Sequence, residues 1–481
     1  MECFCQFAMS MKKKTAIKLR KPERLSAFLG FVASFGFFLL AYPYHLIRRE
    51  QQTLFVFDWD YIRQTYKGEG WLAGFAGDFL EQFFLVPGIG PLVVSLLLTS
   101  IGIVVYRICR HFLGKWPSLA VAAVFFLWSF LRETSNLYIT RYTIVVLGYL
   151  CLILLSLRFK KVWSRSAAAV LAVALGIWTL GSPYHHHYGK LLSFPKIEYD
   201  RVIGLDVECS RENWDKVLKL SEKDLYMVEA SYCYNLAHAV KGDLGNTLFN
   251  HSQNHHYGLL FPVSGNQTVF TNCLAGEAWF QLGDMTVAEQ SAITTLQGSP
   301  KHTGSRYLLR LAKVNLISGE EAAAQKYLDL LSRTLFYGKW ARSMMSGHRD
   351  ESALAQIAEA RSRLIGKDFV HNSDVPRSVL LELLEADPRN RIARNYLLCL
   401  DLLCYDLDHF IEDYKPDMIP AHIYHEAVLI WLSLNDMMTE ENVRSFGVNL
   451  STVERMNRFG RFPDNYKDTY WYYYLEAMNV N

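Results

Sequence analysis

The chain has 481 residues, enough for roughly two to four domains, and a formal net charge of +3. This small total hides two parts of opposite charge, because residues 1–181 hold 20 Lys and Arg against 9 Asp and Glu, whereas residues 182–481 hold 30 against 38. The acidic second part argues against nucleic acid as a ligand. Nine scattered cysteines without a Cys-x-x-Cys spacing predict neither a disulfide framework nor a zinc site.

Five apolar segments in the basic part are predicted to cross a membrane. A tail rich in Lys and Arg, residues 1–24, precedes the first of them, and the 23 uncharged residues of that first segment are enough to cross a hydrocarbon core of about 30 Å. Trp116 and Trp128 suit the membrane interfaces near the third segment. The predicted spans, which make up a transmembrane region over residues 25–181, are residues 25–47, 79–106, 116–131, 137–157 and 162–181.

The distribution of basic residues predicts how these segments face. If the amino terminus is cytoplasmic, 14 Lys and Arg fall on the inner side and 6 on the outer side, which is the bias expected of that orientation. Five crossings then place a juxtamembrane linker, residues 182–199, and everything after it outside the cytoplasm. Arg48 and Arg49, directly after the first span, are exceptions to the rule. The predicted location is an inner or plasma membrane, with residues 200–481 periplasmic or extracellular.

Carboxylates gather in the first outer loop. They are Asp58, Asp60, Glu69, Asp78 and Glu81. Such groups are what a general-base or metal-assisted enzyme acting on a membrane-embedded donor requires, and Asp58 and Asp60 are its candidate catalytic residues. The alternative is that the carboxylates solvate an interfacial loop whose aromatic residues lie at headgroup depth. Arg132, Glu133 and Arg141, around the next outer turn, are expected to be interfacial charges.

From residue 200 onward the pattern predicts paired helices joined by Gly-Asp or Gly-Glu turns. Gly242, Gly283 and Gly319 each precede an acidic residue and are 41 and 36 residues apart, near the period of about 34 residues of tetratricopeptide repeats. In each turn the glycine suits the left-handed conformation that ends the first helix, and the acid begins the second helix near its positive end.

The segment 272–300 resembles the tetratricopeptide repeat family. Five residues stand at the spacing of that family's small residue, aromatic residue, turn glycine, small packing residue and closing proline: Gly276, Trp279, Gly283, Ala288 and Pro300. Three residues of the next unit keep the same frame: Ala312, Gly319 and Ala324. The resemblance implies an α-solenoid over residues 200–481 whose concave face binds a partner. The predicted fold class is therefore mainly α, with a bundle of about five transmembrane helices followed by a tetratricopeptide-like α-solenoid.

Two insertions, residues 250–267 and 347–376, interrupt the helical pattern. Six histidines lie in the first insertion or just after the last span: His185, His186, His187, His251, His255 and His256. Adjacent histidines point in different directions on a regular backbone, so no metal site is predicted, and no phosphate, nucleophile or dinucleotide motif predicts a cofactor. The aromatic segment 469–475 is expected to pack on the final helix pair.

Residues 74–91 carry a resemblance of the whole chain to a family of uncharacterised bacterial envelope proteins. The first hypothesis for function is a membrane-anchored binding protein, not an enzyme, whose outer domain scaffolds a protein partner in the cell envelope. The second is a polytopic glycosyltransferase-like enzyme that uses Asp58 and Asp60 on a lipid-linked sugar. A transport accessory is a third and weaker hypothesis, because the spans carry no acidic relay.

Overall fold

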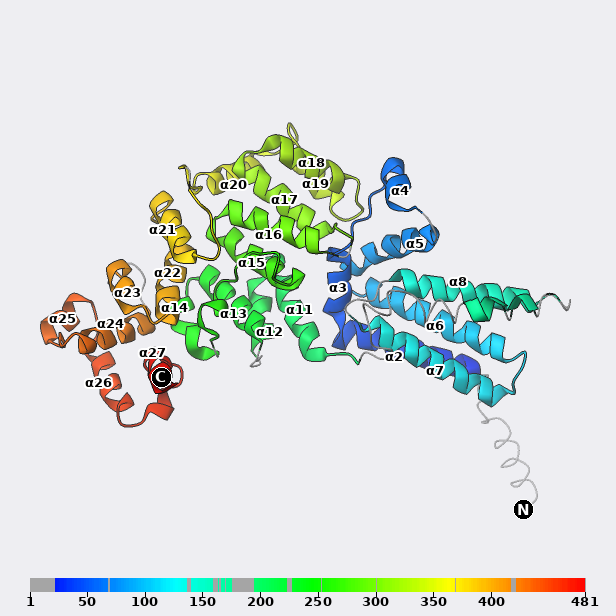
Figure 1. The fold of residues 1–481 in the computed structure, drawn as a ribbon, viewed down its shortest axis with the longest axis horizontal. Helices are drawn as coiled ribbons and strands as arrows, with labels where there is room; N and C mark the ends of the chain where they lie inside the picture. Colours follow the sequence, from blue (N-terminus) through cyan, green and yellow to red (C-terminus); the bar gives the residue numbers. More distant parts are fainter. Residues whose placement is uncertain are drawn as a thin grey trace, which may run out of the picture. The chain divides into compact units, whose positions relative to one another are not determined.

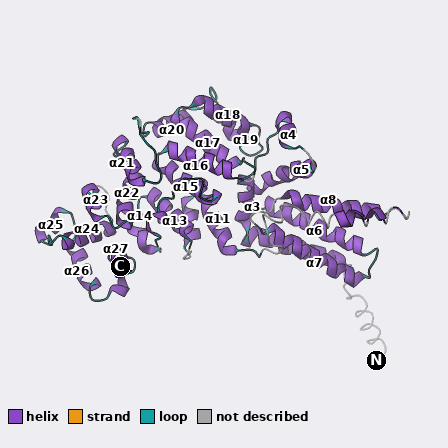
Figure 2. Ribbon diagram, in the orientation of Figure 1, coloured by secondary structure: helices purple, strands orange, loops and turns teal. Residues whose placement is uncertain are grey.

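A computed structural model describes the chain over residues 22–67, 70–135, 140–158, 163, 166–168, 170–174, 194–222, 227–251, 253–299, 301–367, 369–416 and 421–480. All regular structure in these ranges is helical (Figure 2), which confirms the mainly α fold class. The chain divides into two compact units (Figure 1). We call Met1–Glu50 with Phe57–Ile197 the apolar unit, and Gln51–Val56 with Glu198–Asn481 the paired-helix unit.

In the apolar unit, α6 is the central helix. It packs against α2, α7 and α8 (Figure 1), and the buried side chains of Ile101, Val105 and Val146 form part of the core between them. The described helices of this unit are α2 (Pro22–Gly36), the π-helical turn η1 (Phe37–Ala41), α3 (Pro43–Gln51), α4 (Trp59–Thr65), α5 (Trp71–Glu81), the 3-10 turn η2 (Gln82–Leu85), α6 (Ile89–Cys109), α7 (Lys115–Glu133) and α8 (Thr140–Ser156).

Two helical segments in the described ranges, not about five, are long and apolar enough to cross a membrane. They are Pro22–Ala41, with 20 residues, and Ile89–Cys109, with 21. The uncharged stretch of α7 lies between Lys115 and Arg132 and extends only about 24 Å, and the 17 residues of α8 extend about 26 Å, at a rise of 1.5 Å per residue. Both lengths are below the roughly 30 Å of a hydrocarbon core.

Two predicted spans also begin or end elsewhere. The first apolar run breaks at Tyr42, where the backbone leaves the helical region and Pro43 starts α3, because proline suits the first turn of a new helix. The predicted span 79–106 is divided between α5, η2 and α6, and Gly88 in the left-handed conformation precedes α6. Most of the predicted span 162–181 and of the linker 182–199 lies outside the described residues.

In the paired-helix unit, each first helix packs against the helix that follows it: α13 with α14, α15 with α16, and α17 with α18. The helices are α11 (Ile197–Ser210), α12 (Trp214–Ser221), α13 (Val228–Lys241), α14 (Leu244–Thr247), η3 (Leu248–Asn250), η4 (His255–Gly258), α15 (Val269–Leu282), α16 (Met285–Gly298), α17 (Ser305–Ser318), α18 (Glu321–Ser332), α19 (Gly338–Met344), α20 (Glu351–Arg361), α21 (Pro376–Ala386), α22 (Arg391–Leu403), α23 (Leu407–Asp413), α24 (His422–Leu434), α25 (Glu440–Ser445), α26 (Leu450–Phe459), η5 (Pro463–Tyr466) and α27 (Tyr470–Val480).

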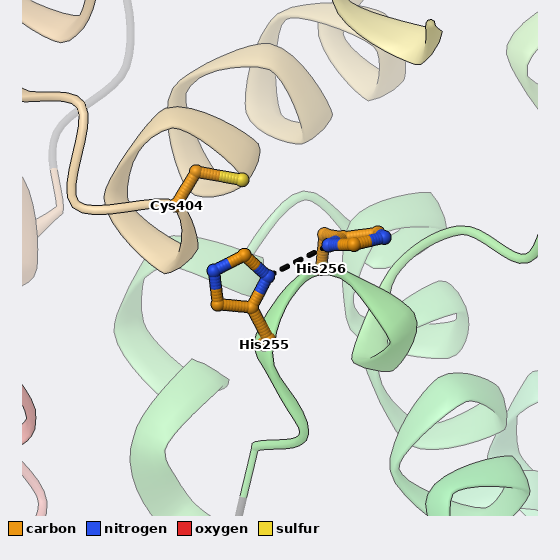
Figure 3. Close-up of side chains that lie close together, drawn as sticks. All are labelled: His255, His256 and Cys404. Atoms are coloured by element: carbon orange, nitrogen blue, oxygen red, sulfur yellow. Dashed lines mark hydrogen bonds between the residues drawn. The ribbon is translucent and has the colours of Figure 1, made fainter. Parts of the chain in front are cut away.

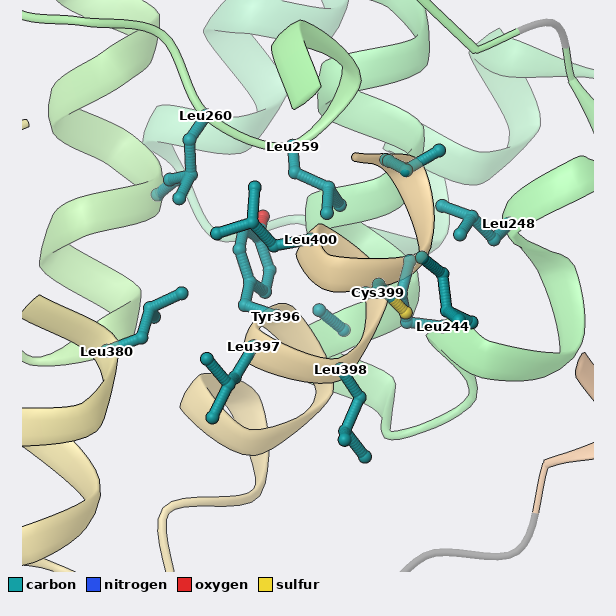
Figure 4. Packing of buried hydrophobic residues seen from close by; sticks show 14 of the residues in the cluster. Leu244, Leu248, Leu259, Leu260, Leu380, Tyr396, Leu397, Leu398, Cys399 and Leu400 are labelled. Atoms are coloured by element: carbon teal, nitrogen blue, oxygen red, sulfur yellow. The ribbon is translucent and has the colours of Figure 1, made fainter. Parts of the chain in front are cut away.

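The first helix of each pair is buried by later parts of the chain. In α15, ten of the 14 residues are buried. Helix α22 packs across α13 and α15, and α20 packs against α17. Figure 4 shows Tyr396 and Cys399 of α22 among Leu244 of α14 and Leu259, which follows η4, all in one hydrophobic core. The resemblance to an α-solenoid implied that the first helices line an open concave face. They do not, because later helices cover them.

The carboxyl-terminal aromatic segment, which was expected to pack on the final helix pair, packs on α24. The side chains of Tyr470 and Trp471 are buried. The Tyr470 amide donates to Oε2 of Glu426 at 2.8 Å, the Trp471 indole donates to the Glu426 carbonyl at 3.0 Å, and Arg455 donates to the other carboxyl oxygen at 3.1 Å. Glu426 thus holds α27 in place through both its side chain and its backbone.

We expect the docking of α27 to weaken as the pH rises. Burial raises the pKa of the Glu426 carboxyl to about 8 from 4.5, in spite of the Tyr470 amide and Arg455. A raised pKa in the docked state means that docking is most favourable below pH 4.5 and is lost progressively toward pH 8. Hydrogen-exchange protection factors of the amides in α27 should fall over this range. Glu426→Gln should remove this pH dependence of protection in α27. If the pH dependence is unchanged in that variant, the Glu426 carboxyl is not its cause.

Candidate functional site

The three predicted turn glycines lie at equivalent places. Gly242, Gly283 and Gly319 end α13, α15 and α17 with φ of +86°, +100° and +83°. The amide of the following residue returns to the last turn of the helix, as in Asp284, whose N–H donates to the Trp279 carbonyl at 3.0 Å. A side chain strains this left-handed backbone, which glycine adopts readily. One turn geometry therefore recurs in three consecutive pairs.

At Gly276, α15 and α16 approach each other closely. A Cβ atom there would lie 3.0 Å from Cβ of Ser291 and closer still to its hydroxyl oxygen, which donates to the Asn272 carbonyl at 2.6 Å. Trp279 and Ala288 are fully buried in the same pair, and Ala312 and Ala324 are fully buried in the next. Pro300 lies outside the described residues.

A buried network of four charged side chains lies beside Gly276. Arg306 on α17 donates to both carboxylate oxygens of Asp206 on α11, at 2.7 and 2.8 Å, and to Glu277 on α15 at 2.9 Å. Arg310, one turn further along α17, donates to the other oxygen of Glu277. Two arginines and two carboxylates balance one another, and all four are at least nine-tenths buried.

The network determines the ionisation of Glu277. Burial by itself would raise the pKa of this carboxyl, but Arg310 and Arg306 outweigh burial and hold the pKa below its usual value. The guanidinium of Arg310 also lies over the ring of Phe280, 3.8 Å from its centre. Glu277 therefore stays ionised inside the unit, because opposite charges within hydrogen-bond distance favour the charged form.

The paired-helix unit includes a short segment from the amino-terminal part of the chain, residues 51–56, which we call the strap. Nη1 of Arg306 donates to the side-chain oxygen of Gln51 at 3.3 Å, and the amide of Ser305 donates to the Thr53 carbonyl at 3.2 Å. A Cβ atom on Gly304 would lie 2.8 Å from the Gln51 carbonyl. The strap thus occupies the amino-terminal end of α17, where unpaired helix N–H groups need acceptors.

Sequence reasoning missed this network. Arg306 and Arg310 are four residues apart, so they lie on one face of α17, and Glu277 follows the packing glycine directly. That spacing was the available signal. It does not reveal that Asp206, about 100 residues earlier, or the strap would complete the set.

Asp58 and Asp60, the candidate catalytic residues, both lie at the start of α4. The Asp58 carboxylate accepts hydrogen bonds from the amides of Asp60 and Tyr61, both at 3.0 Å, and so caps α4. Asp60 is exposed in the first turn of the same helix. This is the usual structural role of an aspartate at a helix start.

Other carboxylates expected at an interface are buried in the apolar unit. Glu133 pairs with Arg49 at 2.7 Å and accepts a hydrogen bond from Thr143. Arg49 and the His45 ring also bond to the Glu133 carbonyl, at 2.7 and 3.0 Å. The expectation that Glu133 is an exposed interfacial charge is therefore wrong.

Asp78 and Glu81 on α5 are also buried and not part of a solvated loop. Asp78 accepts a hydrogen bond from the Tyr66 hydroxyl at 3.0 Å, and Glu81 accepts one from the Thr140 amide at 3.0 Å. Burial, and then the nearby charge of Asp78, raises the pKa of the Tyr66 hydroxyl. These carboxylates connect α5 to its neighbours.

Over the described residues, the structure thus defines a helical protein with two segments of membrane-spanning length and a unit of paired helices. The chain belongs to the family of unknown function DUF6057, which it matches over residues 19–189 and 185–477. No curated protein and no solved structure matches it. This match confirms that the chain belongs to a family without an assigned function. The tetratricopeptide resemblance stays a prediction.

We expect Gly276→Ala to destabilise the paired-helix unit by about 1–3 kcal/mol, since the added methyl group overpacks α15 against Ser291. Adding Ser291→Ala should recover part of the loss because it removes the nearest atom. Gly265→Ala is a matched control, as a Cβ atom at Gly265 meets nothing within 4 Å. Denaturant unfolding of the full chain in detergent measures the effect. Equal stability of the two alanine variants would contradict the close approach.

Arg306→Leu should cost about 3–5 kcal/mol, because it leaves Asp206 and one oxygen of Glu277 buried without a cation. Asp206→Asn in the same chain should restore part of this loss by removing the stranded charge. The exposed pair of Arg444 and Glu440 provides the control, and Arg444→Ala should cost no more than about 1 kcal/mol. The same unfolding measurement would refute the role of the network if both arginine variants lost equal stability.

Proposed function

We propose that this chain is an integral membrane protein whose paired-helix unit is a tetratricopeptide-like domain that binds or scaffolds a protein partner in the cell envelope. The observation that carries the proposal is the recurrence of one packing scheme, in which Gly242, Gly283 and Gly319 close successive first helices. Units that repeat such a scheme present extended surfaces and serve binding more often than catalysis.

A bilayer suits the apolar unit. Its described helices expose large apolar side chains that water would not favour, and lipid would cover them. Among the most exposed are Phe28 and Leu29 on α2, Leu96 on α6, and Val124 and Leu127 on α7. We propose that this unit crosses the membrane about five times, with the shorter helices α7 and α8 accommodated by local thinning of the bilayer.

Charges at the helix ends support a cytoplasmic amino terminus. Lys115 at the start of α7 lies 3.9 Å from Glu23 at the start of α2, and Arg107 lies in the last turn of α6, on the predicted inner side. Arg49, which follows the first span on the predicted outer side, is paired with Glu133. An arginine neutralised inside the protein opposes this orientation less than a free one does. In this topology the paired-helix unit is extracytoplasmic.

The partner surface that we propose is the exposed side of α16 and α18. The first helices are covered by α20 and α22, so the second helices offer the accessible face of consecutive pairs. Gln290 on α16 and Lys326 on α18 are exposed. Residues 182–481 carry 30 Lys and Arg against 38 Asp and Glu, so we expect the partner to contact this unit through a basic segment.

The glycosyltransferase hypothesis gains no support from its named residues. Asp58 caps α4, and Asp60 lies beside it in the first helical turn. Asp58→Asn and Asp60→Asn are therefore suitable negative controls for any activity or binding assay of the whole protein.

Photo-crosslinking in cells tests the partner surface. A crosslinking residue at position 290 or 326 should give the same envelope protein product, and the yield should fall with salt, which screens charge attraction. Position 454 on α26 is also exposed and should not give this product. Failure to capture any protein from positions 290 and 326 would contradict the proposed surface.

Reporter fusions after residue 481 test the topology separately. Alkaline phosphatase, which is active only outside the cytoplasm, should be active there, and a fluorescent protein that matures only inside should be dark. The opposite pattern would remove one of the five proposed crossings and place the paired-helix unit in the cytoplasm.

A further inference from the structure

Three side chains that bind transition metals meet at one place in the paired-helix unit. His255 and His256 come from η4, and Cys404 follows the last turn of α22, so that all three converge in Figure 3. Their ligand atoms lie within 4.8 Å of one another, and the two Nδ1 atoms of the histidines are 2.7 Å apart. The histidines and the cysteine are nearly 150 residues apart in sequence.

The backbone makes this convergence possible. His255 has a φ of +53°, a left-handed conformation that costs a non-glycine residue free energy and persists only where its surroundings enforce it. On a regular backbone two adjacent imidazoles point apart. Here the left-handed turn brings the two rings together, and strained residues of this kind gather at ligand sites.

Buried contacts hold the histidine turn in position. The amide of the fully buried Asn235 side chain donates to the Gly258 carbonyl and to Oε1 of Gln253, both at 2.9 Å. The residues after the turn, Leu259 and Leu260, are buried in the core. The turn η4 packs against both α13 and α22.

The cysteine is held equally firmly. The Cys404 amide donates to the Leu400 carbonyl at 2.9 Å as the C-cap of α22. The next residue, Tyr405, has a φ of +60° and stacks on Tyr473 of α27 with ring centres 5.1 Å apart. The Tyr473 hydroxyl donates to the Leu403 carbonyl at 3.1 Å. The thiol therefore comes from a helix end that a second helix supports.

We propose that His255, His256 and Cys404 bind a Zn²⁺ ion, with the fourth coordination position open to solvent. Two imidazole nitrogens and a thiolate are ligands that zinc prefers, whereas calcium and magnesium require oxygen. When zinc binds, the thiol proton leaves to solvent. The ion joins the first insertion to the end of α22 and so stabilises the closure of α22 over the first helices.

The geometry needs only a small adjustment to accept the ion. With Zn–N bonds of about 2.0–2.1 Å, two nitrogens of a tetrahedral site lie about 3.3 Å apart, and with a Zn–S bond of about 2.3 Å the sulfur lies about 3.6 Å from each nitrogen. The rings must separate slightly and the thiol must move inward. Both changes are open to side chains at an exposed edge, and His255 and Cys404 are exposed.

Cobalt and zinc titrations of the full chain in detergent test the site. After removal of metals with a chelator, Co²⁺ should bind with the sulfur-to-cobalt charge-transfer band of a thiolate ligand, and Zn²⁺ should abolish the band by displacement. Cys404→Ser should remove this band. His255→Ala and His256→Ala should each weaken zinc binding by at least roughly tenfold, since losing even an outer-shell partner costs that much.

His348→Ala is the matched control, because His348 is an exposed histidine elsewhere in the same unit, and it should leave the zinc affinity unchanged. Hydrogen exchange adds a readout that does not need cobalt: zinc should slow exchange in residues 253–258 of the parent chain and not in Cys404→Ser. A charge-transfer band that survives Cys404→Ser, or zinc binding that responds equally to His348→Ala and His255→Ala, would overturn the proposal.

Discussion

The interior of the paired-helix unit depends on the buried guanidinium of Arg306. A charge removed from water is costly unless its donors are matched, and a guanidinium directs its N–H groups in one plane. Asp206 and Glu277 accept hydrogen bonds from its two terminal nitrogens and come from two different helices, so the positions of α11, α15 and α17 are fixed more narrowly than apolar packing alone would fix them. The Gln51 side chain joins the same guanidinium, which makes the strap part of the unit's interior.

The closure of the paired-helix unit decides which surfaces remain for function. Helix α22 lies across α13 and α15, and its burial among leucines from earlier helices removes the first helices from solvent. The same crossing carries Cys404 to the histidine turn η4. The proposed partner surface on the second helices and the proposed zinc site are therefore two consequences of one packing arrangement. In the apolar unit, the buried Arg49 is likewise neutralised by a carboxylate on another helix, Glu133.

Parts of the fold could be predicted because they depend on local chemistry. The left-handed conformation at Gly283 follows from the absence of a side chain, and the pairing of α15 with α16 follows from small residues at Gly276 and Ala288. Apolar composition likewise marked α2 and α6 as helices that suit a membrane. Composition alone did not resolve where the first apolar run breaks, since Pro43 divides a run that was predicted to be one span. Nor did it separate Asp58, which caps a helix, from Glu133, which is buried in an ion pair.

The sequence by itself determined that the chain is helical, that its first part is basic and apolar, and that a turn recurs after each of several helices, because each of these properties depends on residues near one another in the chain. Only the tertiary structure decided which distant residues meet. Asp206 and Arg306 are 100 residues apart, and His255 and Cys404 are separated further still. No local propensity records such pairs, since their contact arises from how whole helices pack, and it is at these contacts that buried charge and metal-binding side chains come together.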